Sequence, residues 1–274
     1  MIDTHQHIWL QSEYRLGWIS EGSVLDRDFG PEQALHELTS AGVAGSVLVQ
    51  VADDYRDTLY MLSVARGFDF VKGVVGWLPL DRPDEAAAAA ELYAKSGLIK
   101  GIRALTHDYE DEAWLLRPSV MRGIGQLHQR GLTLDVCCTT STHLETVSSV
   151  AVRFPGQQIV IDHLGKPEVG RGAWQPWADL IVQAASHPNV HIKLSGLATT
   201  SGDWDAQRWQ PYVDHAIESF GSRRVMLGSD WPVLLGNGDY GRVWRTQLAT
   251  ISRLSATEQH DITAGTATSF YHLA

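Results

Sequence analysis

The chain opens on Met1-Ile2-Asp3-Thr4-His5-Gln6-His7, a stretch that predicts both the first strand of the fold and part of a site. Side chains alternate between the two faces of a strand, so His5 and His7 point the same way and their imidazoles share one volume. Near the other end stands Gly228-Ser229-Asp230-Trp231-Pro232. If a closed barrel places the last strand beside the first, Asp230 joins the two histidines in one pocket.

Between these two segments, short β-rich runs alternate with longer helical patterns, and no linker or low-complexity segment interrupts them. The predicted strands are residues 2–9, 46–52, 71–79, 99–106, 133–139, 158–163, 190–196 and 224–229. The predicted helices are residues 31–41, 57–67, 84–96, 118–130, 143–154, 174–186, 206–220 and 242–253. Eight consecutive strand–helix units predict a single α/β domain over residues 1–274, a (β/α)8 TIM barrel, with a doubly wound open sheet as the structural alternative.

Two further segments stand out from this repeat. Ser255-Ala256-Thr257-Glu258 has the pattern of a capping box and predicts an extra C-terminal helix, which we expect on the exterior of the barrel. The connection over residues 10–30 is far longer than usual between a strand and a helix, and it contains Tyr14 and Trp18. Because such a loop lies at the C-terminal end of the strands, where barrel active sites are built, we predict a lid.

Composition narrows the class of partner. Of 274 residues, 44% are hydrophobic and 20% are charged, which is ordinary for a globular protein. Lys and Arg total 22 against 32 for Asp and Glu, so the formal net charge of -10 favours neither nucleic acid nor an anionic membrane. No apolar run reaches the roughly 18 residues that a membrane span needs. A small-molecule substrate is therefore expected, and the oligomeric state stays open, with a homo-oligomer among the options.

The two cysteines and the first residues bear on the compartment. Cys137 and Cys138 are adjacent within an apolar run, which suits neither a disulfide framework nor a zinc-ligand spacing, so we interpret both as small core residues in a reducing compartment. The first residues lack a basic segment followed by an apolar stretch. A cytoplasmic protein is the expectation.

Polar residues gather at the C-terminal ends of the predicted strands, where the flanking residues are apolar. One such residue alone is usually an ordinary hydrogen-bonding group, but several at the same end of one barrel indicate an active site. The set consists of His5, His7, Gln50, Arg103, His163, Lys166 and Asp230.

Two chemistries use such a set. In the first, the imidazoles of His5, His7 and His163 bind one divalent transition metal together with the carboxylate of Asp230. In the second, Asp230 is a general base that activates water, and the histidines and Arg103 stabilise the developing oxyanion. A binuclear centre is not expected, because Arg103 stands where a carbamate bridge would need a lysine.

Five motifs along the chain, in the same order, resemble the amidohydrolase superfamily and, within it, the branch of sugar lactonases (fuconolactonase-like and rhamnonolactonase-like) and pyrone dicarboxylate lactonases. The closing segment, Gly265-Thr266-Ala267 followed by Phe270-Tyr271, is also similar to the last helix of that superfamily. The motifs are Asp3-Thr4-His5-Gln6-His7, Lys100-Gly101-Ile102-Arg103, Asp162-His163-Leu164-Gly165-Lys166-Pro167, Lys193-Leu194-Ser195-Gly196-Leu197 and Gly228-Ser229-Asp230-Trp231-Pro232.

The resemblance implies hydrolysis of a cyclic ester, with Asp230 activating water and His5, His7 and His163 beside the lactone carbonyl. Arg103 and Lys166 would bind substrate or stabilise the oxyanion. Members of this branch differ in their need for metal, so no cofactor is expected to be essential, and a single zinc ion is the alternative.

The substrate class follows from charge and from aromatic content. A pyrone dicarboxylate would call for several converging cations, whereas Arg103 and Lys166 are the clearest pair here, so a neutral polyhydroxylated lactone fits better. Several of the ten tryptophans fall near the predicted mouth, where ring faces can stack on a sugar. Lys193, deeper in its strand, is interpreted as structural. The residues predicted to contact substrate are Arg103, Lys166, Gln50, Trp231, Trp18 and Trp77.

Two other functions stay open at this point. One is a mononuclear metal-dependent amidohydrolase or decarboxylase from a neighbouring branch, which the set His5, His7, His163 and Asp230 would permit. The other is a ligand-binding barrel that has lost catalysis, against which the intact acid–base set argues.

Overall fold

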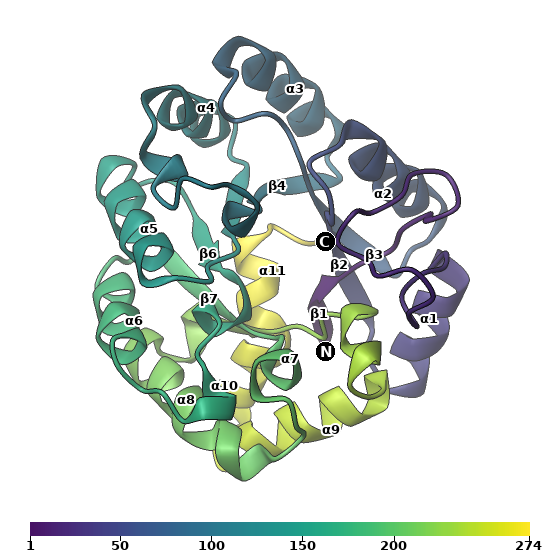
Figure 1. The fold of residues 1–274 in the computed structure, drawn as a ribbon, viewed down its shortest axis with the longest axis vertical. Helices are drawn as coiled ribbons and strands as arrows, with labels where there is room; N and C mark the ends of the chain where they lie inside the picture. Colours follow the sequence, from purple (N-terminus) through teal and green to yellow (C-terminus); the bar gives the residue numbers. More distant parts are fainter.

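A computed structural model describes residues 1–274 and shows eight parallel strands arranged in chain order around a barrel (Figure 1). The ring closes through backbone hydrogen bonds beyond the strand ladders, from His7 N to Trp231 O at 2.7 Å and from Asp230 N to His5 O at 2.8 Å. The (β/α)8 barrel is thereby confirmed over the doubly wound sheet. The strands are β1 (Ile2–Gln6), β2 (Gly45–Val49), β3 (Val71–Gly76), β4 (Ile99–Ala104), β5 (Thr133–Val136), β6 (Ile159–Ile161), β7 (Val190–Leu194) and β8 (Val225–Leu227).

The helices alternate with the strands and form the outer ring (Figure 1). None of them combines the length and the apolar character needed to cross a membrane. The short helix after β7 was not predicted. The helices are α1 (Pro31–Ser40), α2 (Tyr55–Gly67), α3 (Pro83–Ser96), α4 (Pro118–Gln129), α5 (Ser141–Arg153), α6 (Trp177–Ala185), α7 (Leu197–Ser201), α8 (Ala206–Phe220), α9 (Tyr240–Ile251), α10 (Ala256–His260) and α11 (Thr266–Phe270).

The strands end a few residues earlier than predicted, and the extra residues build the site. β6 stops at Ile161, and His163 then adopts a left-handed backbone with φ of 53°. β8 stops at Leu227, and Asp230 has φ of 62°. Non-glycine residues rarely adopt this conformation, which turns both side chains out of the alternating pattern of a strand.

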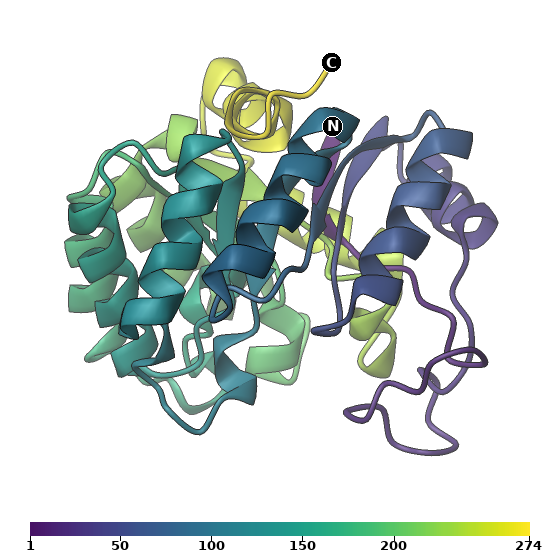
Figure 2. The same cartoon turned by 90° about the horizontal axis from the view of Figure 1, so that it is seen from above.

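The capping box at Ser255 is confirmed, since its hydroxyl accepts from Glu258 N and the Glu258 carboxylate accepts from Ser255 N. The C-terminal helix was expected on the exterior of the barrel, and the structure makes its position more specific. α11 crosses the N-terminal end of the barrel, at the end where the N-terminus lies (Figure 2). Phe270 and Tyr271 pack there with valines of the barrel strands, because contact between these side chains buries apolar surface of both the segment and the strands.

The long segment after β1 is held by contacts of its own. Trp9 and Phe29 exchange two backbone hydrogen bonds, of 3.1 and 2.9 Å, which close the segment into a loop. Within it, the Tyr14 hydroxyl donates to Asp57 Oδ1 at 3.2 Å, and the Trp18 indole N–H donates to Val51 O at 3.2 Å. The loop is therefore tied to α2 and to the segment that follows β2, and its role as a lid stays a prediction.

Two glycines of α4 allow a paired test of packing. A Cβ on Gly123 would overlap the carbonyl group of Leu80, whereas a Cβ on Gly125 would meet only the Phe154 ring, at 3.6 Å. Gly123→Ala is expected to lower the free energy of unfolding by about 1 to 3 kcal/mol, because backbone atoms cannot yield as a side chain can. Gly125→Ala is expected to raise it by about 0.5 to 1 kcal/mol. Urea denaturation measures both, and equal effects would contradict this packing.

Candidate active site

A cavity of about 240 Å³ opens at the C-terminal end of the strands. A second cavity, of about 400 Å³, lies at the opposite end and contains none of the predicted site residues. The first cavity is lined by His7, Trp18, Val51, Arg103, Leu105, His107, Asp108, Cys137, His163, Lys166, Asp230 and Val233.

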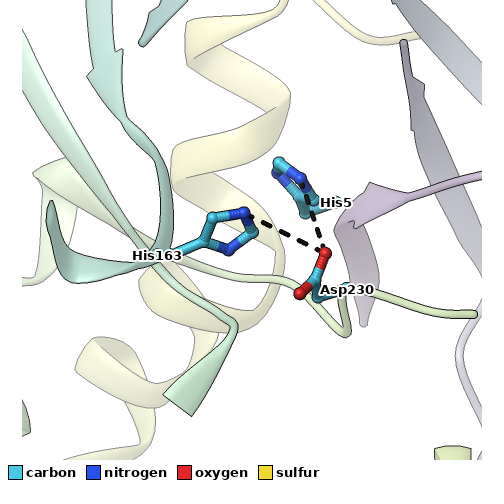
Figure 3. A group of neighbouring side chains, drawn as sticks. All are labelled: His5, His163 and Asp230. Carbon is cyan, nitrogen blue, oxygen red and sulfur yellow. Dashed lines mark ion pairs between the residues drawn. The ribbon is translucent and has the colours of Figure 1, made fainter. Parts of the chain in front are cut away.

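The carboxylate of Asp230 lies among three imidazoles. Its Oδ1 is 3.3 Å from His7 Nε2, 3.9 Å from His5 Nε2 and 4.0 Å from His163 Nε2. Figure 3 shows the rings of His5 and His163 facing this oxygen. The structure thus brings together the four residues that the sequence predicted as catalytic or metal-binding.

Asp230 is ionised at neutral pH. Burial raises the pKa of its carboxyl, but His163, the hydrogen bond with His7 and the charge of Arg103 together outweigh burial, so the net pKa lies below the ordinary 3.8. An ionised carboxylate in a small cavity can accept a proton from water or bind a cation.

His5 is fully buried at the end of β1. A Cβ at Gly228 would lie 2.6 Å from the His5 Cβ, so only glycine lets β8 approach this closely. His5 Nδ1 is 3.1 Å from Lys193 Nζ and 3.3 Å from Asp162 Oδ1, whereas Nε2 has no hydrogen-bond partner and faces Asp230. Burial lowers the pKa of this imidazole well below 6.5, so the ring is neutral at neutral pH.

His163 is held from both sides of its ring. Its Nδ1 lies 2.9 Å from Ser195 Oγ, and Arg103 Nη2 lies 3.3 Å from its Nε2. Because a guanidinium can only donate, Nε2 accepts and the ring proton is on Nδ1. Burial lowers the pKa of His163 well below 6.5 as well.

His7 faces two hydrogen-bond acceptors. Its Nδ1 is 2.7 Å from the backbone oxygen of Val49, and its Nε2 is 3.3 Å from Asp230 Oδ1. A neutral imidazole has one N–H, which the shorter contact with Val49 takes. The contact with Asp230 is the longer of the two.

Arg103, on β4, donates hydrogen bonds to three neighbouring residues at the wall of the cavity. Its Nε donates to Asp162 Oδ2 at 2.8 Å, its Nη1 donates to Gln50 O at 3.0 Å, and its Nη2 donates to His163. Gln50 is fully buried and its amide donates to Arg103 O at 3.3 Å. Gln50 thus lies behind Arg103 and does not line the cavity.

The remaining predicted residues divide between the cavity wall and the core. Lys166 and Trp18 line the cavity, and the Trp18 side chain is 47% exposed. Trp231 is fully buried with its ring 5.4 Å from Phe29, and Trp77 packs against Tyr55. Neither Trp231 nor Trp77 lines the cavity.

Sequence reasoning assigned no role to several cavity residues. His107 and Asp108 line the cavity from the turn after β4, and the only signal for them was their position just beyond a strand end. Cys137 also reaches the wall. Burial raises the pKa of its thiol, which keeps it protonated and suits the interpretation as a small core residue.

Part of this group has the composition of a metal site. Ligand atoms of His5, His163 and Asp230 all lie within 4.8 Å of one another. Two neutral imidazoles and a carboxylate are ligands that a divalent transition metal accepts, and the unpartnered Nε2 of His5 is aimed into the gap. The residues present therefore fit a single divalent ion.

The chain is similar to several known proteins. The model of a family described as amidohydrolase matches residues 2–273. An L-fucono-1,5-lactonase of Burkholderia ambifaria is 38% identical over 88% of this chain and 84% of its own length. An L-fucono-1,5-lactonase of Burkholderia multivorans is 33% identical over 99% of this chain and 96% of its own length. A crystal structure of a zinc-bound amidohydrolase from Burkholderia multivorans matches with a TM-score of 0.91 and 31% identity, over 100% of this chain and 99% of that one.

Proposed function

The chain belongs to the amidohydrolase family, and from this membership we propose that it opens the cyclic ester of a sugar lactone to give the free sugar acid. The observation that carries the proposal is the ionised carboxylate of Asp230 at the wall of a small cavity, surrounded by three imidazoles. The two similar L-fucono-1,5-lactonases support a lactone as the substrate class.

In the proposed reaction, Asp230 takes a proton from a water molecule held between it and His5. The water oxygen attacks the lactone carbonyl carbon. The resulting oxyanion accepts hydrogen bonds from donors of the cavity wall. Among these donors, Lys166 is a cation that makes no ion pair within the protein, whereas Arg103 pairs with Asp162. The intermediate then collapses, the ring C–O bond breaks, and the leaving oxygen takes the proton from Asp230.

The charges of the cavity favour a neutral lactone. The charge of Arg103 is largely compensated by Asp162, and Asp108 adds a negative group to the wall. For the two charges of a dicarboxylate, the cavity offers one uncompensated cation, Lys166, and the carboxylate of Asp108 would repel them. We therefore propose an aldonolactone such as L-fuconolactone or L-rhamnonolactone, with Trp18 covering one face of the sugar.

The alternative is a zinc-dependent hydrolase or decarboxylase of a related branch, which the ligand group of His5, His163 and Asp230, with His7 beside it, favours. A bound zinc ion would polarise the substrate carbonyl and acidify water. Metal analysis of protein purified without chelators separates the two mechanisms. A stoichiometric metal whose removal abolishes turnover would favour the alternative.

A panel of lactones tests the proposal directly. Acid release in a pH-stat is expected with six-carbon aldonolactones and not with a pyrone dicarboxylate. Release of acid from none of the sugar lactones would overturn the proposed function.

The pH dependence follows from the lowered pKa values of the pocket. The pKa of Asp230 is lowered from the ordinary 3.8, and the pKa values of His5 and His163 are lowered well below 6.5. Asp230 therefore stays ionised and both imidazoles stay neutral as the pH falls from neutral. We expect kcat/KM to stay flat from about pH 7 down to about pH 5. A pH–rate profile with an acid limb centred near 6.5 would show that an imidazole must titrate for catalysis.

A further inference from the structure

Lys193 lies inside the barrel on β7, fully buried, directly against His5. Its ammonium nitrogen is 2.6 Å from Asp135 Oδ2, 3.1 Å from Asp162 Oδ1 and 3.1 Å from His5 Nδ1. An ammonium group has three N–H donors and no acceptor, and here three acceptors surround it. Asp135 Oδ2 and His5 Nδ1 accept hydrogen bonds from the ammonium, and Asp162 pairs with it by charge. One of the two hydrogen-bond partners of Lys193 is therefore an imidazole of the candidate active site.

The contact between Lys193 and His5 decides where His5 carries its proton. If Nδ1 accepts from the ammonium, the ring proton of the neutral imidazole is on Nε2. In the other tautomer, Nδ1–H would donate to Asp162 Oδ1, 3.3 Å away, and would point toward the ammonium. That arrangement would leave Asp135 as the one hydrogen-bond acceptor of a fully buried ammonium, which is costly.

Other buried residues hold Lys193 in this place. Asp135 Oδ2 also accepts from the hydroxyl of Tyr271, at 2.6 Å, so the C-terminal segment braces the carboxylate that pairs with Lys193. The second oxygen of Asp162 accepts from Arg103. Because both carboxylates are fixed by further partners, the ammonium has little freedom to leave His5.

We propose that Lys193 is a positioning residue that keeps His5 in the Nε2–H tautomer, so that His5 donates a hydrogen bond into the cavity and binds a divalent metal weakly. His163 differs, since its proton is on Nδ1 and its Nε2 is an acceptor. A metal on His5 Nε2 needs the lone pair of that nitrogen. Metal binding would therefore require the proton to move to Nδ1 and the hydrogen bond from Lys193 to break.

The catalytic part of this proposal rests on the proposed lactone hydrolysis, in which the Nε2–H of His5 would orient the water or the developing oxyanion. The tautomer and the metal affinity do not depend on it. Both are measured without a substrate, so their failure and the failure of the proposed function are distinguishable.

The tautomer is tested on the wild-type protein. Long-range ¹H–¹⁵N spectra of metal-free, ¹⁵N-labelled protein report which ring nitrogen of each histidine is protonated, and the signals that disappear in His5→Gln belong to His5. For His5 we expect an unprotonated Nδ1 and a protonated Nε2. A proton on Nδ1 of His5 would overturn the proposal, and this measurement requires no change at Lys193.

Zinc affinity supplies the second test. Lys193→Met keeps the length of the side chain and removes the ammonium, and competition with a chromogenic chelator is expected to show zinc binding at least about tenfold tighter than in the wild type. The matched control is Lys95→Met, which removes the same charge from the exposed surface of α3 and should leave zinc affinity unchanged. Equal zinc affinity of Lys193→Met and wild-type protein would contradict the proposal.

Discussion

Asp230→Asn is expected to lower kcat for lactone hydrolysis by at least about 10³-fold while the protein stays folded. The amide has nearly the volume of the carboxylate, so the surrounding packing is retained. It cannot accept a proton from water, however, and it brings no negative charge to His7, His5 and His163. Steady-state kinetics on the best lactone of the panel, together with thermal unfolding, measure both parts of this result.

The matched control for this variant is Asp239→Asn. Asp239 caps the N-terminus of α9 by accepting from Arg242 N at 2.8 Å, and asparagine caps a helix about as well as aspartate. Activity should therefore be unchanged. Retained kcat in Asp230→Asn, with normal substrate affinity, would mean that the base lies elsewhere.

Arg103→Met is expected to cost about 3 to 5 kcal/mol in the free energy of unfolding, and to abolish turnover. Removal of the guanidinium leaves the buried carboxylate of Asp162 without its 2.8 Å partner, and leaves the backbone oxygen of Gln50 and the ring of His163 without a donor. Arg103→Lys should recover only part of the loss, because a compact ammonium does not span the positions of the three guanidinium nitrogens that bind Asp162, Gln50 and His163. Urea denaturation measures the change.

A surface pair provides the comparison for Arg103. The Arg117 guanidinium contacts Asp111 at 2.6 Å, but both side chains are exposed. Arg117→Met should leave the unfolding free energy nearly unchanged, because water screens an exposed ion pair. Comparable losses of unfolding free energy in Arg103→Met and Arg117→Met would show that burial does not increase the contribution of Arg103 to stability.

The residues at the strand ends were predictable because each carries its own signal. His5 and His7 follow the period of two of a strand, and Asp230 follows an apolar run at the other end of the chain. Once eight strand–helix units indicate a barrel, the rule that active sites lie at the C-terminal ends of strands brings these residues together.

Burial and hydrogen-bond partners were not predictable in the same way. Trp231, Trp77 and Trp18 were all predicted near the mouth of the barrel, yet only Trp18 lines the cavity. The ring of Trp231 packs against Phe29 and the ring of Trp77 against Tyr55. No local pattern distinguishes these three tryptophans.

By itself, the sequence determined the order of the elements, the parallel barrel and the group of histidines with Asp230, because periodicity and strand-end position are local properties. Only the tertiary structure decided that the C-terminal helix closes the N-terminal end of the barrel, and that Lys193, Asp135 and Asp162 meet behind His5. Those contacts join residues from separate strands, and their strength depends on exclusion of water, which a sequence pattern does not encode.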